Sequence, residues 1–180
     1  MEGWPKQLVR YAVAALVIVL AHSGPAAAQD LTTVLVVRHT EKVSDASDAV
    51  LSEVGWNRAR ELQRITADAN ITVLFASQYA RAQQTLEPIA NQLGLEILVH
   101  DAGDSEGLAR RILADHAGEV VLVSGHSNTV TEIVAALGAP EPPPIEDWDY
   151  DDLFVVTIGP EQNARVVHLS YGEPSALPEP

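Results

Sequence analysis

The segment TVLVVRHTEK occupies residues 33–42 and joins a short apolar run to a polar turn. Its first five residues are aliphatic or β-branched, which predicts a strand buried on both faces of a sheet. Arg38 and His39 follow directly, so they are expected at the carboxyl end of that strand. Ligands of open parallel sheets bind beyond the carboxyl ends of the strands. This segment therefore predicts both a buried strand and the place of a functional site.

Further short apolar runs continue this pattern along the chain. They alternate with amphipathic segments, which predicts an α/β domain with a largely parallel sheet. The runs at residues 71–75, 96–99, 120–123 and 154–158 are expected to be buried strands, and residues 165–169 an edge strand.

The amphipathic segments between these runs predict helices that cover the sheet. Each has apolar residues at helical spacing and a capping residue or a glycine at one end. They are residues 53–69 after Ser52 as N-cap, 79–93 before Gly94 with a bend at Pro88, 106–116 between Ser105 as N-cap and Gly118, and a segment carrying Val130, Ile133, Val134 and Leu137 that ends at Gly138.

A proline-rich acidic stretch, residues 140–152, is expected to form a solvated loop rather than a separate functional motif. Trp148 and Tyr150 should pack against the body of the domain. Whether one of its carboxylates faces the site stays open at this point.

The amino-acid composition excludes several classes of partner and of site chemistry. The 180 residues are 47% hydrophobic and 20% charged, which is an ordinary globular balance. Eleven Lys and Arg stand against 25 Asp and Glu, a formal charge of -14, which makes nucleic acid an unsuitable partner. The chain has no cysteine, which excludes disulfides, thiolate nucleophiles, cysteine-ligated zinc and a lipoprotein anchor.

The N-terminus carries the features of a signal peptide. Lys6 and Arg10 precede an apolar stretch, residues 11–21, and an A-x-A site ends at Ala28. The stretch is shorter than the roughly 20 residues that span a bilayer. Residues 1–28 are therefore expected to be removed, leaving residues 29–180 as a single exported domain, periplasmic or secreted, that does not span the membrane.

Basic residues are expected to gather at the carboxyl edge of the sheet. Arg38 and His39 follow the first strand, and Arg81 lies one helical turn beyond the second. His126 follows the strand at residues 120–123. A cationic pocket in an acidic chain suits a dianion, because each guanidinium group can donate two parallel hydrogen bonds to phosphate oxygens. The pattern predicts a phosphoryl-binding site.

Other chemistries fit these residues less well. A metal site built on His39, Glu41 and His126 is disfavoured because neighbouring guanidiniums repel a divalent cation. Residues 124–127 read SGHS, which is not the G-x-S-x-G turn of serine hydrolases, and no G-x-x-x-x-G-K-[ST] nucleotide loop is present.

Four motifs together resemble the histidine phosphatase, or phosphoglycerate mutase-like, superfamily. They are VVRHTEK (36–42), LSEVGWNRA (51–59), SQYARAQQT (77–85) and VSGHSN (123–128). The resemblance implies that His39 is the nucleophile, while Arg38, Arg81 and His126 hold the phosphoryl oxygens. It also implies a three-layer α/β/α sandwich that uses no metal and no cofactor.

The resemblance leaves the general acid and the substrate open. Where many relatives carry a glutamate, residues 99–107 read VHDAGDSEG and offer Asp101, Asp104 and Glu106. The leading expectation is a metal-independent phosphatase of small phosphomonoesters. The alternatives are a phosphohistidine phosphatase-like activity and a non-catalytic phosphoryl-binding protein on the same fold. A mutase is disfavoured because few basic residues remain for a second phosphate site.

Overall fold

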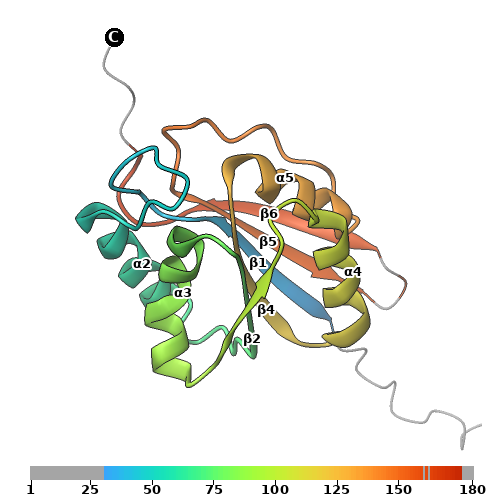
Figure 1. Ribbon diagram of the computed structural model, residues 1–180. Helices are drawn as coiled ribbons and strands as arrows, with labels where there is room; N and C mark the ends of the chain where they lie inside the picture. The colour runs from blue at the N-terminus through green and yellow to red at the C-terminus, as the bar shows by residue number, and fades with distance from the viewer. Residues whose placement is uncertain (1–30, 160, 162, 176–180) are drawn as a thin grey trace, which may run out of the picture.

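The computed structural model describes residues 31–159, 161 and 163–175. Its strands are β1 (Thr32–Arg38), β2 (Val73–Ser77), β3 (Ile97–His100), β4 (Val120–Gly125), β5 (Asp152–Ile158) and β6 (Ala164–Ser170). They form one sheet in the order β3-β2-β4-β1-β5-β6 (Figure 1). β1, β2, β3 and β4 pair in parallel, whereas β5 pairs antiparallel with β1, and β6 pairs antiparallel with β5. The expected α/β class with a mostly parallel sheet is confirmed.

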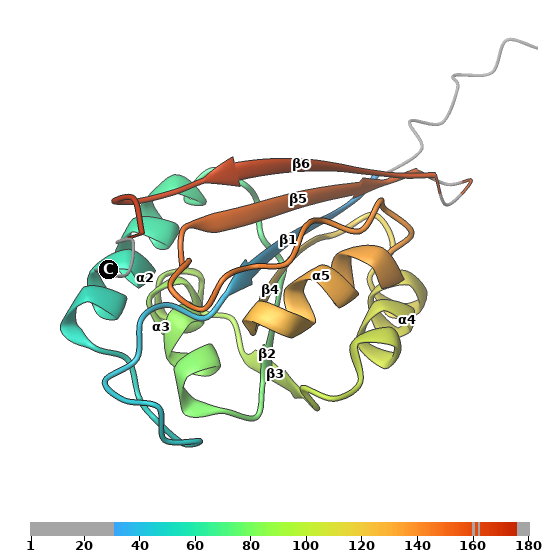
Figure 2. The same cartoon turned by 90° about the horizontal axis from the view of Figure 1, so that it is seen from above.

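Helices cover both faces of this sheet. They are α2 (Glu53–Ile65), α3 (Ala80–Leu93), α4 (Ser105–Asp115) and α5 (Ser127–Ala136). Figure 2 shows α2 and α3 on one side and α4 and α5 on the other, which confirms the three-layer α/β/α sandwich.

Strand β1 explains why two helical layers are needed. Val34 and Val36 enter the core under α4 and α5, while Leu35 and Val37 enter the core under α2 and α3. Successive side chains of a strand point to opposite faces, so a run of aliphatic residues requires cover on both. The end of β1 is thereby fixed at the centre of the domain.

Three details differ from the sequence-based expectations. β3 is an edge strand, and Val99 is 50% exposed, because its only partner strand among the described residues is β2. α4 is capped by Asp104, whose carboxylate accepts from Gly107 N at 2.9 Å, rather than by Ser105. α2 ends at Ile65, before residue 69, because Thr66 Oγ1 donates to Leu62 O at 2.8 Å and closes the last turn. Ser52 is the N-cap of α2, as expected.

The expected signal peptide, residues 1–28, lies outside the described residues. In the part of the chain that is described, no helix has the length and apolar character needed to cross a membrane.

Candidate functional site

His39 lies at the end of β1. One nitrogen of its ring is hydrogen-bonded, and the other has no hydrogen bond among the described residues. Its Nδ1 lies 2.8 Å from Thr40 O, and because a carbonyl only accepts, Nδ1 carries the hydrogen. Nε2 therefore keeps its lone pair. The side chain is 3% exposed, and burial, followed by the positive charges of the site, lowers the pKa of His39 to about 3. The imidazole is neutral at pH 7 and has the protonation state of a nucleophile.

The backbone after His39 is fixed to α3. Thr40 is fully buried, and its N–H donates to Thr85 Oγ1 at 3.0 Å. Thr85 Oγ1 in turn donates to Arg81 O at 2.8 Å. The turn that carries the imidazole is therefore joined to the helix that carries Arg81.

Arg38 is anchored by the loop that precedes β5. Its Nη1 donates to the carbonyls of Glu146 and Asp149, at 2.8 Å each. The ring of Tyr150 covers the guanidinium, with 4.1 Å between its centroid and Cζ. Arg38 is 4% exposed, and this burial lowers its pKa from the ordinary value. The loop at residues 140–152 was expected to be a solvated loop rather than a separate motif, and the structure shows that it contacts Arg38 through two carbonyls and the Tyr150 ring.

Arg81 reaches the site from the first turn of α3. Its Nη1 donates to Ser47 O at 2.6 Å, and its Nη2 donates to His126 Nδ1 at 3.4 Å. Tyr79 lies beneath the guanidinium, 4.6 Å from Cζ to the ring centroid. The chain order predicted that Arg81 and His126 would meet, and the structure brings them together.

His126 follows β4 and packs against His39. The two ring centroids lie 5.2 Å apart in an edge-to-face arrangement. Because Arg81 can only donate, His126 Nδ1 accepts, so Nε2 carries the hydrogen and donates to Ser77 Oγ at 2.8 Å. Burial, then Arg81 and Arg38, lowers the pKa of His126 to about 4. This second imidazole is also neutral at pH 7.

Both arginines carry an unused donor. Among the described residues, Arg38 Nε and Arg81 Nε are buried and have no hydrogen-bond partner. A buried donor without a partner costs about 1 to 3 kcal/mol, so two in one site are significant. Each needs an acceptor oxygen, which an oxyanion would supply.

A cavity of about 410 Å³ opens beside these groups. Its charged lining residues are Arg38, Arg81, Lys42 and Asp147, joined by Tyr79 and His126. Three cations therefore surround a space that contains one carboxylate. This charge balance favours a dianionic ligand attached to a polar group.

The three carboxylates expected to provide a general acid are used elsewhere. Asp101 Oδ1 accepts from Gly103 N at 2.7 Å, Asp104 caps α4, and Glu106 pairs with Arg110 on the surface. None of the three lines the 410 Å³ cavity, although Ala102 and Gly103 do. Asp147 lines it instead, and its sequence signal was the acidic run EDWDYDD at residues 146–152.

Glu41 pairs with Arg58, and within the described residues its carboxylate is not grouped with His39 and His126 as a metal site. Its Oε1 accepts from Arg58 Nη2 at 2.8 Å. Arg58 Nη1 also donates to Tyr171 O at 3.1 Å and Glu173 O at 2.8 Å. This buried pair ties the turn after β1 to α2 and to the chain after β6.

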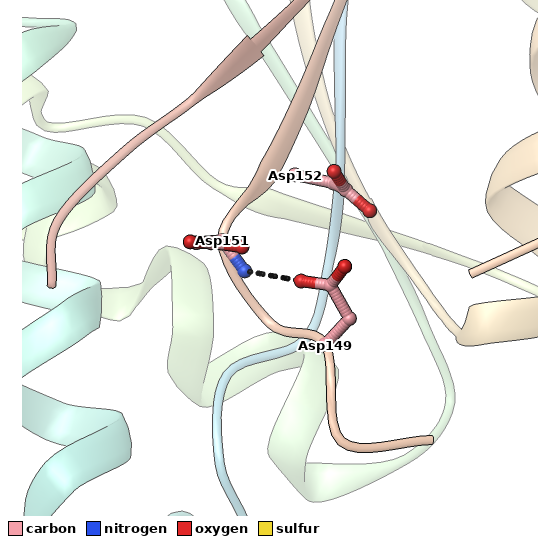
Figure 3. A group of neighbouring side chains, drawn as sticks. All are labelled: Asp149, Asp151 and Asp152. Carbon is pink, nitrogen blue, oxygen red and sulfur yellow. Dashed lines mark hydrogen bonds between the residues drawn. The ribbon is translucent and has the colours of Figure 1, made fainter. Parts of the chain in front are cut away.

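Three carboxylates gather where the loop enters β5. One ligand atom each of Asp149, Asp151 and Asp152 lies within 4.8 Å of the others (Figure 3). Burial and the neighbouring carboxylates raise the pKa of Asp149. Each carboxylate has a partner: Asp149 Oδ1 accepts from Asp151 N at 3.4 Å, Asp151 Oδ2 from Ser175 N at 3.2 Å, and Asp152 bonds to His168. We assign no ion to this group.

A family model and several solved structures match this chain. The family model described as the histidine phosphatase superfamily (branch 1) matches residues 34–102, from β1 to the turn after β3. No curated protein sequence matches the chain.

Solved structures share the fold. The protein histidine phosphatase SixA complexed with tungstate has a TM-score of 0.62 and 23% identity, covering 77% of this chain and 96% of that one. The mycobacterial glucosyl-3-phosphoglycerate phosphatase has a TM-score of 0.62 and 13% identity, covering 78% and 98%. YhfR of Bacillus stearothermophilus has a TM-score of 0.57 and 17% identity, covering 72% and 92%.

Proposed function

We propose that the chain is a histidine phosphatase that hydrolyses phosphomonoesters through a phosphohistidine on His39, because the model of that superfamily matches residues 34–102 and solved phosphatases share the fold. The observation that carries this proposal is the state of the His39 ring. Thr40 O holds the hydrogen on Nδ1, and burial keeps the ring neutral, so Nε2 is free to attack.

The reaction proceeds in two displacements at phosphorus. His39 Nε2 attacks in line while the ester oxygen leaves, and water then attacks the phosphohistidine and releases phosphate. Arg38 and Arg81 stabilise the charge on the phosphoryl oxygens with the Nε donors that have no other partner. Binding of a dianion next to His126 raises the pKa of that ring and favours its acting as a further donor.

The proposed reaction needs no metal. Arg38, Arg81 and Lys42 supply three positive charges around the cavity, which is the charge that a divalent ion would otherwise bring. We expect activity to persist in EDTA. Loss of activity in EDTA with recovery on adding a divalent cation would contradict this part of the proposal.

Small phosphomonoesters are the proposed substrates, and phosphohistidine is the second candidate. One structure that shares the fold is named a protein histidine phosphatase, and another a glucosyl-3-phosphoglycerate phosphatase. A screen of sugar phosphates, nucleotides, phospholipid head groups and phosphohistidine would separate the two classes.

Trapping of the intermediate tests the mechanism. Rapid quenching with labelled substrate should give a phosphoenzyme that is acid-labile and alkali-stable, with the label in the peptide containing residues 36–42. His39→Ala should remove label and turnover, whereas His100→Ala on the edge strand β3 should keep both. A label on serine or a carboxylate, or normal turnover in His39→Ala, would contradict covalent catalysis. Tungstate binding without turnover of any substrate would favour the non-catalytic phosphoryl-binding alternative.

We also propose that the protein acts outside the cytoplasm, as the N-terminal sequence suggests. N-terminal sequencing of the exported protein should find a start within a residue or two of Gln29. A membrane-bound form that retains Met1 would contradict cleavage.

A further inference from the structure

The turn at residues 146–149 is held over the site by the arginine that binds phosphate. Asp149 N donates to Glu146 O at 3.0 Å, which closes the turn. Arg38 Nη1 donates to the carbonyls at both ends of it, Glu146 O and Asp149 O. Asp147 lies at the tip of this turn. Its backbone position is therefore fixed relative to Arg38 by two hydrogen bonds that do not involve its own side chain.

Asp147 is placed and available to act on a substrate. It lines the same cavity as Arg38, Arg81 and His126, and its negative charge acts on Arg38. The side chain is exposed, and within the described residues its carboxylate accepts no hydrogen bond. Asp101, Asp104 and Glu106 do not line this cavity, so Asp147 is the carboxylate that a bound ester would meet.

We propose that Asp147 donates the proton to the leaving group and then accepts a proton from the attacking water. This inference rests on the proposed phosphatase function and assigns its missing acid. The carboxylates that follow β3 do not line the cavity, and the turn before β5 supplies the carboxyl group instead.

The bonds and protons of the two reaction steps balance. First, the bond from phosphorus to His39 Nε2 forms while the ester P–O bond breaks, and the ester oxygen takes the proton of the Asp147 carboxyl group and leaves as the alcohol. Second, water attacks phosphorus, the Asp147 carboxylate takes a proton from it, and the N–P bond breaks with its electron pair returning to Nε2. Hydrogen phosphate leaves, and His39 and Asp147 are restored.

The test compares two esters in the variant Asp147→Asn. An alkyl ester such as glycerol phosphate needs its leaving oxygen protonated, whereas nitrophenolate leaves p-nitrophenyl phosphate without help. We expect kcat/KM on glycerol phosphate to fall about a hundredfold to ten-thousandfold, with less than about a threefold change on p-nitrophenyl phosphate.

Glu141→Gln is the matched control, because its exposed side chain lies in the same loop and does not line the cavity. It should keep wild-type rates on both esters. Equal losses on both esters in Asp147→Asn, or no loss on glycerol phosphate in an active protein, would overturn the role of Asp147 alone. A wild-type protein that hydrolyses neither ester would overturn the phosphatase mechanism and this inference with it.

Discussion

Arg81 Nη2 donates to His126 Nδ1 at 3.4 Å, so the arginine determines which nitrogen of that imidazole carries the hydrogen. The same guanidinium donates to Ser47 O through Nη1, and within the described residues its buried Nε has no partner. One planar group thus contacts a ring and a loop and retains one further donor. An ammonium group has no planar array of donors that could do the same.

Replacing Arg81 by lysine should therefore impair catalysis. We expect Arg81→Lys to lower kcat/KM by about tenfold to a thousandfold, or about 1.4 to 4 kcal/mol of transition-state stabilisation. Steady-state kinetics on a phosphomonoester measures this. Arg60→Lys, on the exposed face of α2, is the control and should match the wild type. Wild-type kinetics in Arg81→Lys would mean that Arg81 does not hold the phosphoryl group.

The two buried histidines predict loss of stability in acid. Burial lowers the pKa of His39 to about 3 and that of His126 to about 4, against about 6.5 in the unfolded chain. Below pH 6.5 the unfolded chain takes up protons that the folded protein does not. The free energy of unfolding therefore falls as the pH drops, by about 1.4 kcal/mol per pH unit for each histidine.

Urea denaturation at pH 7 and pH 5 tests this effect in the wild type and in His39→Gln. The glutamine variant should lose about 2 kcal/mol less than the wild type over that interval, since one titrating group is gone and the other groups are shared. An identical pH dependence in both proteins would mean that His39 protonates normally in the fold.

Breaking the buried pair of Arg58 and Glu41 should destabilise the protein. Arg58→Met leaves the Glu41 carboxylate buried without its cation, which costs about 3 to 5 kcal/mol. The double variant with Glu41→Leu should recover much of this loss, because neither charge then remains. Arg64→Ala removes an exposed pair with Glu61 and should leave the urea midpoint unchanged. A wild-type midpoint in Arg58→Met would show that the pair is not structural.

A phosphate mimic should stabilise the folded protein by satisfying the two arginine Nε donors. Tungstate, which is bound in the SixA structure, is the chosen probe. At a hundredfold excess over its Kd it should add about 2.7 kcal/mol, observed as a higher Tm. Arg81→Lys should reduce the shift, and sodium chloride at equal ionic strength should not produce it. A Tm shift that is equal in Arg81→Lys and the wild type would mean that the anion binds elsewhere.

The histidines and arginines of the site could be predicted from sequence because they follow strands that the hydrophobic pattern predicts, and the helices between these strands indicate a parallel sheet. A parallel sheet brings the carboxyl ends of β1, β2 and β4 to one edge. Arg38, His39 and His126 therefore lie close together for any conformation of the loops. Ser52 as a helix cap was predicted on equally local grounds. The role of Gly55 was not: a Cβ there would lie 2.1 Å from Glu41 O, so the glycine permits α2 to approach the turn after β1.

Asp147 could not be assigned from sequence, because its position depends on contacts far along the chain. The proline-rich loop has no periodicity. Its conformation is set by hydrogen bonds from Arg38 to Glu146 O and Asp149 O, which lie 108 and 111 positions later in the chain. The edge position of β3 was missed for a related reason. An apolar run predicts a strand, but strand order decides whether that strand has one neighbour or two.

The contacts of Arg38 also determine when during folding the site can form. β1 emerges first, yet it pairs with β4 and β5, and its terminal arginine is anchored by a turn more than 100 residues later. Arg58, which pairs with Glu41 in the turn after β1, is anchored by the carbonyls of Tyr171 and Glu173. Such distant pairings carry a large loop-closure entropy and form late. A partly synthesised chain therefore has no assembled site, and activity arises only when nearly the whole domain has folded.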